Sequence, residues 1–210
     1  PVGYQFILHG ATSRTPMTRR EETLNDPDVQ AMERLAHGDD MALNEIMDRW
    51  TSRLGAFLTR YLGNQIDAIN VTQDVFVAVY RNRNSYRPQS RYSTWIFGIA
   101  ANLARQQLRW RRRHPEMPFS DEEQTPQPHD SNRDPARKML SDERAAAVRD
   151  AVLGLPPRLR EAILLSEFEQ LPHRESAVIL GCSTKAVETR VHRGKQRLRQ
   201  QLQAWLPRRQ

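Results

Sequence analysis

The sequence predicts an all-α protein made of two small helical domains joined by a flexible linker. Apolar residues recur at steps of three and four along most of the chain, which is the period of an amphipathic helix. Only 9 of the 210 residues are glycine and 38% are hydrophobic, which falls short of a large glycine-punctuated α/β core. The charge divides into two basic blocks, +6 over residues 31–115 and +5 over 139–210, separated by −3 over 116–138.

This charge pattern gives the expected domain boundaries. Residues 1–25 lack periodicity and are expected to be a disordered N-terminal extension, followed by a first domain at 26–115. Residues 116–138 hold four prolines and few apolar side chains, so they cannot bury enough surface to offset chain entropy and are predicted to be a linker. The second domain is expected at 139–206.

Composition also excludes several classes of protein. The single cysteine, Cys182, cannot form an internal disulfide or a cysteine-based metal site, which favours a reducing compartment. The first ten residues lack the basic region of a secretory signal, and no apolar run reaches the length of about 20 that spans a bilayer. We therefore expect a cytoplasmic protein without membrane insertion.

Three helices are predicted in the first domain. The first begins with Asp39 as N-cap and ends at Leu62-Gly63-Asn64, a helix stop signal. The second runs from about Asp67 to Arg81, and the third runs from an N-cap at Ser93 to Arg113. The apolar faces of the three are Ile46, Met47, Trp50, Leu54, Phe57, Leu58 and Tyr61; Val71, Val75, Phe76 and Val79; and Trp95, Ile96, Ile99, Ala100 and Leu103.

The second domain is also predicted to be helical. Its first helix begins with Ser141 as N-cap and ends at Gly154, the next opens at Pro156-Pro157, and Pro172 begins a short helix that reaches Leu180. The apolar positions of the first two are Val148, Ala151, Val152 and Leu155, then Leu159, Ala162, Ile163 and Phe168.

The sharpest local signal is helix-turn-helix spacing near the end of the chain. Ala177 lets two helices approach, Gly181 permits a tight turn, and β-branched Val187 fills the angle between the helices. On the last helix an apolar stripe of Val187, Val191, Leu198 and Leu202 leaves a polar, basic face that suits a DNA major groove. A basic run alone would favour an ordinary solvated helix surface, but the turn spacing reverses that preference.

A second basic surface lies in the first domain. Arg105, Arg109 and Arg112 follow one another at helical steps and suit a phosphate backbone. Ahead of them, aromatic residues alternate with arginines, as in a single-strand stacking platform, although Tyr80 and Trp95 could equally be core residues. The aromatic residues are Tyr80, Tyr86, Tyr92 and Trp95, and the arginines are Arg83, Arg87 and Arg91.

These motifs together resemble the extracytoplasmic-function (ECF) sigma factors of the sigma-70 family. DAINVTQDVFVAVYRN followed by STWIFGIAANLARQQLRWRRR resembles their region 2, and LGLPPRLREAILLSEFEQLPHRESAVILGCSTKAVETRVHRGKQRLRQQL resembles their region 4. The resemblance covers about 45–113 and 140–203. It implies a dissociable subunit that binds core RNA polymerase, recognises the minus-ten and minus-thirty-five promoter elements, and is controlled by an anti-sigma factor. It implies no catalytic group and no cofactor.

The resemblance also assigns roles to residues. It implies that region 2 captures an extruded base with the loop from Asn82 to Tyr92, where Gln89 and Ser90 could also hydrogen-bond the base. The polymerase contact is expected at Asp67, Gln73 and Asp74. Minus-ten DNA is expected at Asn84, Ser85, Tyr86, Tyr92, Trp95, Arg105, Arg109 and Arg112. Minus-thirty-five DNA is expected at Lys185, Thr189, Arg190, His192, Arg193, Lys195, Gln196 and Arg197, with Arg193 and Thr189 nearest the bases.

The chain departs from the family pattern at three places. Ile69-Asn70 stands where an acidic pair is usual, which implies either a weaker polymerase contact or a contact carried more by the acidic and amide residues that remain. Glu188 stands at a position that is often basic, where a carboxylate repels phosphate and can accept from a cytosine amine. Ser176 stands at a usually apolar position and should loosen the packing.

Two other functions compete with this interpretation. The chain could be an autonomous two-domain helix-turn-helix regulator, although a sensor domain would need neither the basic helix nor the aromatic loop of the first block. An enzyme is disfavoured, because the sequence holds no HExxH, GxSxG, Walker loop or clustered metal ligands. For His173 and His192 a structural role is favoured over metal binding. We expect no metal, no cofactor and no small-molecule substrate.

Overall fold

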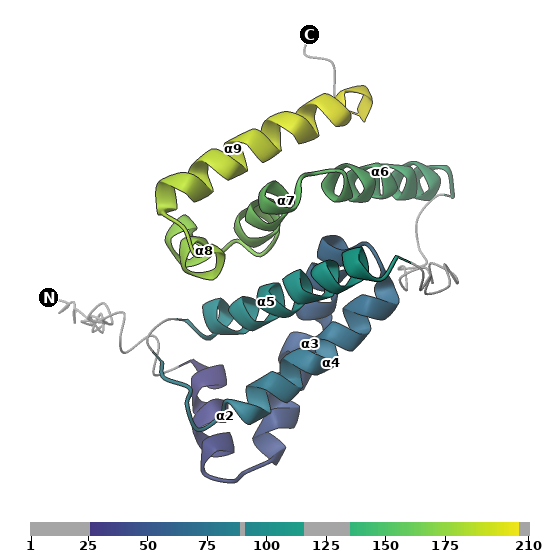
Figure 1. Ribbon diagram of the computed structural model, residues 1–210. Coiled ribbons are helices and arrows are strands. Elements are labelled where there is room, and N and C mark those ends of the chain that lie inside the picture. Colours follow the sequence, from purple (N-terminus) through teal and green to yellow (C-terminus); the bar gives the residue numbers. More distant parts are fainter. Residues whose placement is uncertain (1–25, 89–90, 116–134, 206–210) are drawn as a thin grey trace, which may run out of the picture.

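The computed structural model describes residues 26–88, 91–115 and 135–205 (Figure 1). Within these ranges the chain forms helices and turns and no β-strand, so the predicted all-α class is confirmed. The predicted N-terminal extension, most of the predicted linker, and loop residues Gln89 and Ser90 lie outside the described residues.

The first domain is built from α2 (Pro27–Ala36), α3 (Met41–Leu62), α4 (Gln65–Arg81) and α5 (Tyr92–Arg113). α3 packs against the other three helices, and α4 also packs against α5. Aromatic side chains form its centre: the ring of Phe97 meets those of Trp50 and Phe57 edge-on, at centroid distances of 5.8 and 5.1 Å.

Helix α2 was not predicted, although its start carries a recognisable signal. The Asp26 side chain accepts a hydrogen bond from the backbone N–H of Asp28 at 2.9 Å, and Pro27 occupies the first helical position. The helix is only ten residues long, and it buries Val29, Met32 and Leu35 against the domain. Tertiary packing therefore stabilises it, because an isolated helix of this length is marginal.

The predicted starts of the other three helices are each off by one or two residues. α3 begins after Asp40 rather than after Asp39, whose carboxylate instead pairs with Arg34 at 3.3 Å. α4 begins at Gln65, because the Asn64 side chain caps it by accepting from the N–H of Asp67 at 2.9 Å. α5 begins at Tyr92, so the predicted N-cap, Ser93, lies inside its first turn.

The second domain consists of α6 (Pro135–Leu153), α7 (Pro157–Ile163), a π-helical turn η1 (Leu164–Phe168), α8 (His173–Leu180), α9 (Thr184–Gln201) and a 3₁₀ turn η2 (Gln203–Trp205). α6 begins six residues before the predicted N-cap at Ser141, with a proline at a position that proline favours. Pro172 is the N-cap of α8 rather than its first residue.

Two residues predicted to face the core are exposed. Val148 is 38% exposed on α6, although Ala151, Val152 and Leu155 further along the chain are buried as predicted. Phe168 is 37% exposed, because in η1 the N–H of Glu169 bonds the carbonyl of Leu164, five residues back. This wider turn displaces the following side chains around the helix axis relative to the regular α-helix that the pattern predicts.

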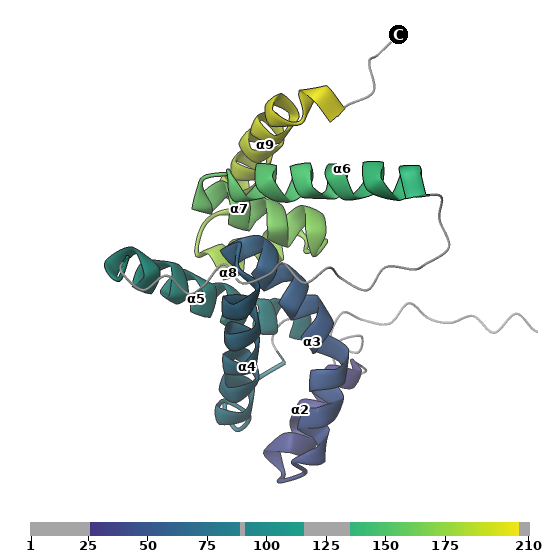
Figure 2. The ribbon, with the colours of Figure 1, turned by 90° about the vertical axis from the view of Figure 1, so that its right-hand side faces the viewer.

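The two domains pack against each other. α8 packs on α5, η1 contacts α3, and α6 contacts the C-terminal part of α3 (Figures 1 and 2). Gly63 ends α3 with φ 73°, and a β-carbon there would lie 2.9 Å from Cδ2 of Leu153 in the other domain. α9, in contrast, lies on the side of the second domain that faces away from the first domain.

Candidate nucleic-acid and polymerase interfaces

The helix-turn-helix has the geometry that its spacing predicts. Gly181 ends α8 in the left-handed region at φ 57°, and the N–H of Cys182 bonds the carbonyl of Ala177 at 3.1 Å. The Ser183 side chain then caps α9 by accepting from the N–H of Ala186 at 3.2 Å. Val187 is fully buried between the two helices. The turn therefore holds α9 at a fixed angle with its polar face outward.

All eight residues predicted to contact upstream DNA lie on α9 and reach its surface. Lys185, Thr189, His192, Arg193, Gln196 and Arg197 are exposed, whereas Arg190 and Lys195 are half-buried. Two of the cations have carboxylate partners: Lys185 pairs with Glu188 at 3.1 Å and Lys195 with Glu167 at 2.6 Å. These pairs are exposed and therefore weak, so neither prevents a cation from contacting phosphate.

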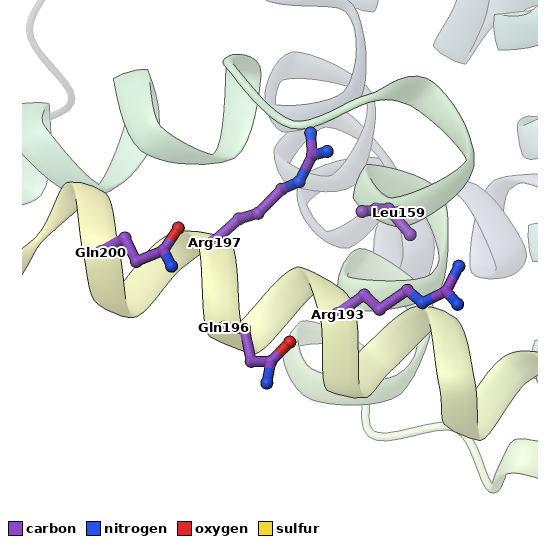
Figure 3. A pocket seen from close by; sticks show the side chains of 5 residues that line it. All are labelled: Leu159, Arg193, Gln196, Arg197 and Gln200. Carbon is purple, nitrogen blue, oxygen red and sulfur yellow. The ribbon is translucent and has the colours of Figure 1, made fainter.

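Part of this face borders a shallow hollow between α9 and α7 (Figure 3). The hollow has a volume of about 460 Å³ and is lined by Leu159, Arg193, Gln196, Arg197 and Gln200. Figure 3 shows both arginines extending from α9 toward α7. The lining is polar and basic, which suits a phosphate backbone better than an apolar ligand.

Gly194 sets how closely α9 packs, and sequence reasoning missed it. The residue is buried on the inner face of α9, and a β-carbon there would lie 2.6 Å from Cγ1 of Ile163. The signal available in the sequence was a glycine in the middle of a helix, which usually marks a packing requirement.

The arginines of α5 differ in their surroundings. Arg109 and Arg112 are exposed. Arg105 donates from Nη1 to Oε1 of Glu161 in the second domain at 2.5 Å. Two of the three predicted phosphate contacts are thus accessible, and the third is occupied by a carboxylate.

The tyrosines predicted to stack on a base are instead packed in the first domain. Tyr92 is fully buried and Tyr86 is 8% exposed; with Trp95 they form an aromatic cluster whose ring centroids are 4.8 to 6.0 Å apart. Burial, together with the nearby carboxylate of Asp28, raises the pKa of Tyr92. In this conformation neither tyrosine ring is free to stack on DNA. Hydrophobic burial outweighed the polarity of the surrounding loop, which had suggested an exposed platform.

Other predicted minus-ten contacts do reach the surface. Asn84 and Ser85 are exposed, and Trp95, the third member of the aromatic cluster, is half-buried. Tyr80 is also half-buried and lies under the guanidinium of Arg83, 4.1 Å from the ring centroid.

Of the three α4 residues predicted to contact polymerase, two are exposed and one is buried. Gln73 and Asp74 are exposed, and they share the outer face of α4 with two apolar side chains, Ile69 at 52% and Val77 at 45% exposure. Asp67 is only 2% exposed, and its Oδ2 lies 2.5 Å from Nη2 of Arg111 on α5. The expectation that Asp67 faces a partner is therefore not met, because Asp67 pairs inside the domain.

The buried carboxylates of the second domain were missed altogether. Glu161, Glu169 and Glu175 are each 4–6% exposed, and each contacts a residue of the first domain. Burial raises the pKa of Glu161, while the adjacent Arg105 opposes this shift. The partners lie 56 to 116 residues away in the sequence, so no local pattern indicates them.

The hydroxyl of Ser176, at the position that is usually apolar, contacts the hydroxyl of a half-buried serine. Ser176 is fully buried, and its Oγ lies 3.4 Å from Oγ of Ser166. The contact gives the hydroxyl a polar neighbour in an otherwise apolar position.

None of the helices in the described part of the chain is both long and apolar enough to cross a bilayer. Among the same residues, no group of three His, Cys, Asp or Glu side chains is placed to hold a metal ion.

Comparison with known families matches both domains. The family model for sigma-70 region 2 matches residues 46–114, and the model for sigma-70 region 4 matches residues 145–198. The ECF RNA polymerase sigma-E factor of Haemophilus influenzae is 31% identical over 181 residues, covering 84% of this chain and 95% of the relative. The RNA polymerase sigma-H factor of Pseudomonas aeruginosa is 30% identical over 186 residues, covering 86% and 96%.

Solved structures are similar over both domains. CnrH in complex with the cytosolic domain of CnrY matches with a TM-score of 0.63 and 25% identity, over 85% of this chain and 99% of CnrH. The sigma factor RpoE from Bartonella quintana, in complex with the anti-sigma factor NepR, matches in fold with a TM-score of 0.61 and 22% identity, over 76% and 96%. From the two matched regions and these relatives, we conclude that the chain belongs to the ECF group of the sigma-70 family of RNA polymerase sigma factors.

Proposed function

We propose that this chain is an alternative sigma factor that binds core RNA polymerase, recognises two promoter elements and so initiates transcription. The observation that carries the proposal is the pairing of two domains in one chain, each with its own basic surface. An autonomous helix-turn-helix regulator is not favoured, because it would leave the region 2 match and the basic surface of α5 without a role.

The outer face of α4 is the surface proposed for polymerase. Exposed apolar residues next to polar ones are typical of protein contact sites, and this face combines Ile69 and Val77 with Gln73 and Asp74. α4 packs its other side on α3 and α5, so binding here would not disturb the core. Asp67 then acts indirectly, by fixing α4 against α5 through Arg111.

The outer face of α9 is the surface proposed for the minus-thirty-five element. Thr189 and Arg193 are proposed to contact base edges. Arg190, Lys195 and Arg197 would then contact phosphates, with Lys185, His192 and Gln196 beside them. The fixed turn before α9 and its position away from the first domain support this assignment.

The minus-ten element is proposed to contact α5 and the loop before it. Arg105, Arg109 and Arg112 would hold the backbone, while Asn84, Ser85 and Trp95 would contact an extruded base. Tyr86 and Tyr92 shape the loop from inside, because they are buried beneath it. They could stack on a base only after the aromatic cluster rearranges.

We further propose that the protein acts in the cytoplasm, where polymerase and promoter DNA are found, and that an anti-sigma protein regulates it. The similarity to CnrH, whose structure is a complex with the cytosolic domain of CnrY, supports such a partner.

The test is reconstitution with purified core RNA polymerase on fragmented genomic DNA, followed by sequencing of transcript 5′ ends. The proposal expects start sites that share two upstream elements and that vanish when the chain is omitted. Tight, sequence-specific DNA binding without polymerase, and no new start sites with it, would instead support an autonomous regulator. Asp74→Lys should weaken polymerase binding without unfolding the domain, because Asp74 is exposed.

A further inference from the structure

The C-terminal end of α5 carries an aromatic pair that the proposed function leaves without a role. Trp110 and His114 lie about one turn apart on the helix, and their rings are stacked, with centroids 4.8 Å apart and an interplanar angle of 24°. Nδ1 of His114 also lies 3.0 Å from the carbonyl oxygen of Trp110. The two rings are therefore held together in a defined position at the helix end.

Hydrophobic packing does not account for this pair. Leu103 and Leu108 on the same helix pack against the core of the first domain, as does Trp95 near its start. Trp110 belongs to neither of the two hydrophobic cores that the described residues form, and it is only half-buried, while His114 is exposed. A single apolar side chain at a surface is ordinary, but two stacked rings offer a flat face on which a third ring can stack.

The surroundings of the pair are basic. Residues three and four apart are neighbours on a helix surface, so Arg113 lies beside Trp110, and Arg109 lies beside Arg113. Both arginines are exposed, and α5 contains no aspartate or glutamate. Within the described part of the chain, the ion pairs of α5 are made by Arg105 and Arg111 and leave these two arginines without a carboxylate.

This combination of rings and cations favours single-stranded nucleic acid as the ligand. Guanidinium groups suit phosphates, and aromatic rings suit the faces of bases, which become accessible when the bases are unpaired and unstacked. The outer face of the exposed His114 ring can extend the stack by one base. An acidic peptide would pair with the arginines but would leave the two rings without a partner.

The pair lies at the opposite end of α5 from the proposed base contact at Trp95. Trp95 and Trp110 are 15 positions apart in the sequence, which is about 22 Å along a helix. One DNA strand of several nucleotides can therefore contact both ends of α5. The exposure of Arg109, Arg113 and His114 is that of the chain with both domains in place, so the site is accessible without any rearrangement.

We infer that Trp110 and His114 form a stacking site for an unpaired base of single-stranded DNA, with Arg109 and Arg113 on the flanking phosphates. Because every base has a π-face, the site stabilises opened DNA without selecting a sequence. This inference rests on the proposed function, because it takes α5 as a DNA-contacting helix.

The test compares two fluorescein-labelled strands of equal charge, a 20-nucleotide oligo(dT) and a 20-nucleotide abasic strand, binding to the full-length chain by fluorescence anisotropy. The wild-type chain should prefer oligo(dT). Trp110→Ala should weaken binding to oligo(dT) by about fivefold or more, the lower end for losing one stacked base, and should leave binding to the abasic strand within about twofold. His114→Ala should act in the same direction, whereas Trp110→Phe keeps a ring and should retain most of the affinity.

Two further variants separate stacking from other effects. Trp205→Ala removes a partly exposed tryptophan of the second domain, so it is the matched control and should bind both strands as the wild type does. Arg113→Ala should weaken binding to both strands alike and lower the salt slope by about 0.7.

A wild-type chain that binds both strands equally would overturn the inference. So would a Trp110→Ala variant, with helix content intact by circular dichroism, whose affinity is unchanged or falls equally on both strands. If Trp110→Ala lost helix content, His114→Ala, at an exposed position, would decide by the same criteria. Failure of the proposed function would look different: the wild-type chain would not direct transcription by core polymerase, although its preference for oligo(dT) persisted.

Discussion

Helices α5 and α9 are both rich in arginine, yet their cations have different surroundings. On α5, Arg105 and Arg111 pair with the buried carboxylates of Glu161 and Asp67. On α9, the cations that have a salt-bridge partner, Lys185 and Lys195, make pairs at the surface. The two basic helices therefore differ in role: part of the positive charge of α5 forms ion pairs that stabilise the fold, whereas the positive charge of α9 stays accessible to DNA.

The difference arises from what packs over each helix. α5 packs against α8 of the second domain as well as against α3 and α4, while the main contacts of α9 are with its own domain, chiefly α7 and α8 (Figure 1). Substitutions on α5 should therefore change stability, and substitutions on the outer face of α9 should change DNA binding.

The largest effect is expected for Arg111→Ala. The substitution leaves Asp67 buried without its cation, and an uncompensated buried charge is strongly destabilising. Because Arg111 is 31% exposed, we expect a loss of about 2–3 kcal/mol in the free energy of unfolding, less than the roughly 3–5 kcal/mol of a fully buried broken pair. Urea denaturation measures it, with Arg112→Ala as the exposed control. Equal stability of the two variants would place Arg111 among the solvated cations.

A smaller loss is expected for Gly194→Ala. The added methyl group would lie 2.6 Å from the buried side chain of Ile163, so α9 and α7 must separate or Ile163 must leave its rotamer. Overpacking of this kind costs about 1–3 kcal/mol. Gly55→Ala is the control, since a β-carbon at Gly55 meets nothing within 4 Å and should stabilise α3 slightly. If Gly194→Ala raised the melting temperature as Gly55→Ala does, the close contact would be absent.

On the exposed face of α9 the expected change is in DNA recognition rather than stability. Arg193→Ala should reduce discrimination between matched and scrambled upstream elements by about 1–3 kcal/mol if the side chain reaches a base edge. Arg197→Ala should weaken both DNAs alike and lower the salt slope by about one unit. Electrophoretic mobility shifts with holoenzyme, at several salt concentrations, separate the two. Equal losses on both DNAs for Arg193→Ala would assign it to phosphate.

Sequence patterns predicted those features of the fold that depend on residues close together in the sequence. The helical period, the Gly63 and Gly181 stops and the spacing of Ala177, Gly181 and Val187 all act within a few residues, and the structure has each of them. The outer face of α9 followed directly from the same pattern, because its inner stripe was visible in the sequence.

The pattern could not predict contacts between distant parts of the chain. Asp67 and Tyr92 are polar or amphipathic residues beside exposed ones, and only the packing of α5 on α4 and α3 buries them. Likewise, Glu161 lies on an ordinary short helix, and its burial depends on a domain contact 56 residues away in the sequence. The sequence pattern therefore did not predict the burial of Asp67 and Tyr92, whereas the residues of α9 do lie on the surface; the DNA and polymerase contacts of both groups stay predictions.

The buried Glu161, which pairs with Arg105 of α5, should make the free energy of unfolding modestly dependent on pH. Burial raises the pKa of Glu161 in the folded state, opposed by Arg105, Arg190 and the hydrogen bond with Tyr61. Folding therefore takes up a proton between the ordinary pKa and the raised one. The stability contribution of Glu161 is full below pH about 4.5 and is lost as pH rises through the raised value.

Glu161→Gln removes this titration. The difference in free energy of unfolding, wild type minus variant, should fall as pH increases above about 4.5. A difference that stayed constant or rose over this range would mean that Glu161 is not desolvated by the domain contact.

The distance between the two domains tests the account most directly. Dyes placed at Asp48→Cys in α3 and Glu143→Cys in α6, in a Cys182→Ser background, report that distance by energy transfer, and both labelled positions are exposed. The account predicts high transfer efficiency for the free chain, because the second domain packs on α3 and α5 of the first. Low efficiency in the free chain, with helix content intact, would contradict this packing and the use of α5 charge in it.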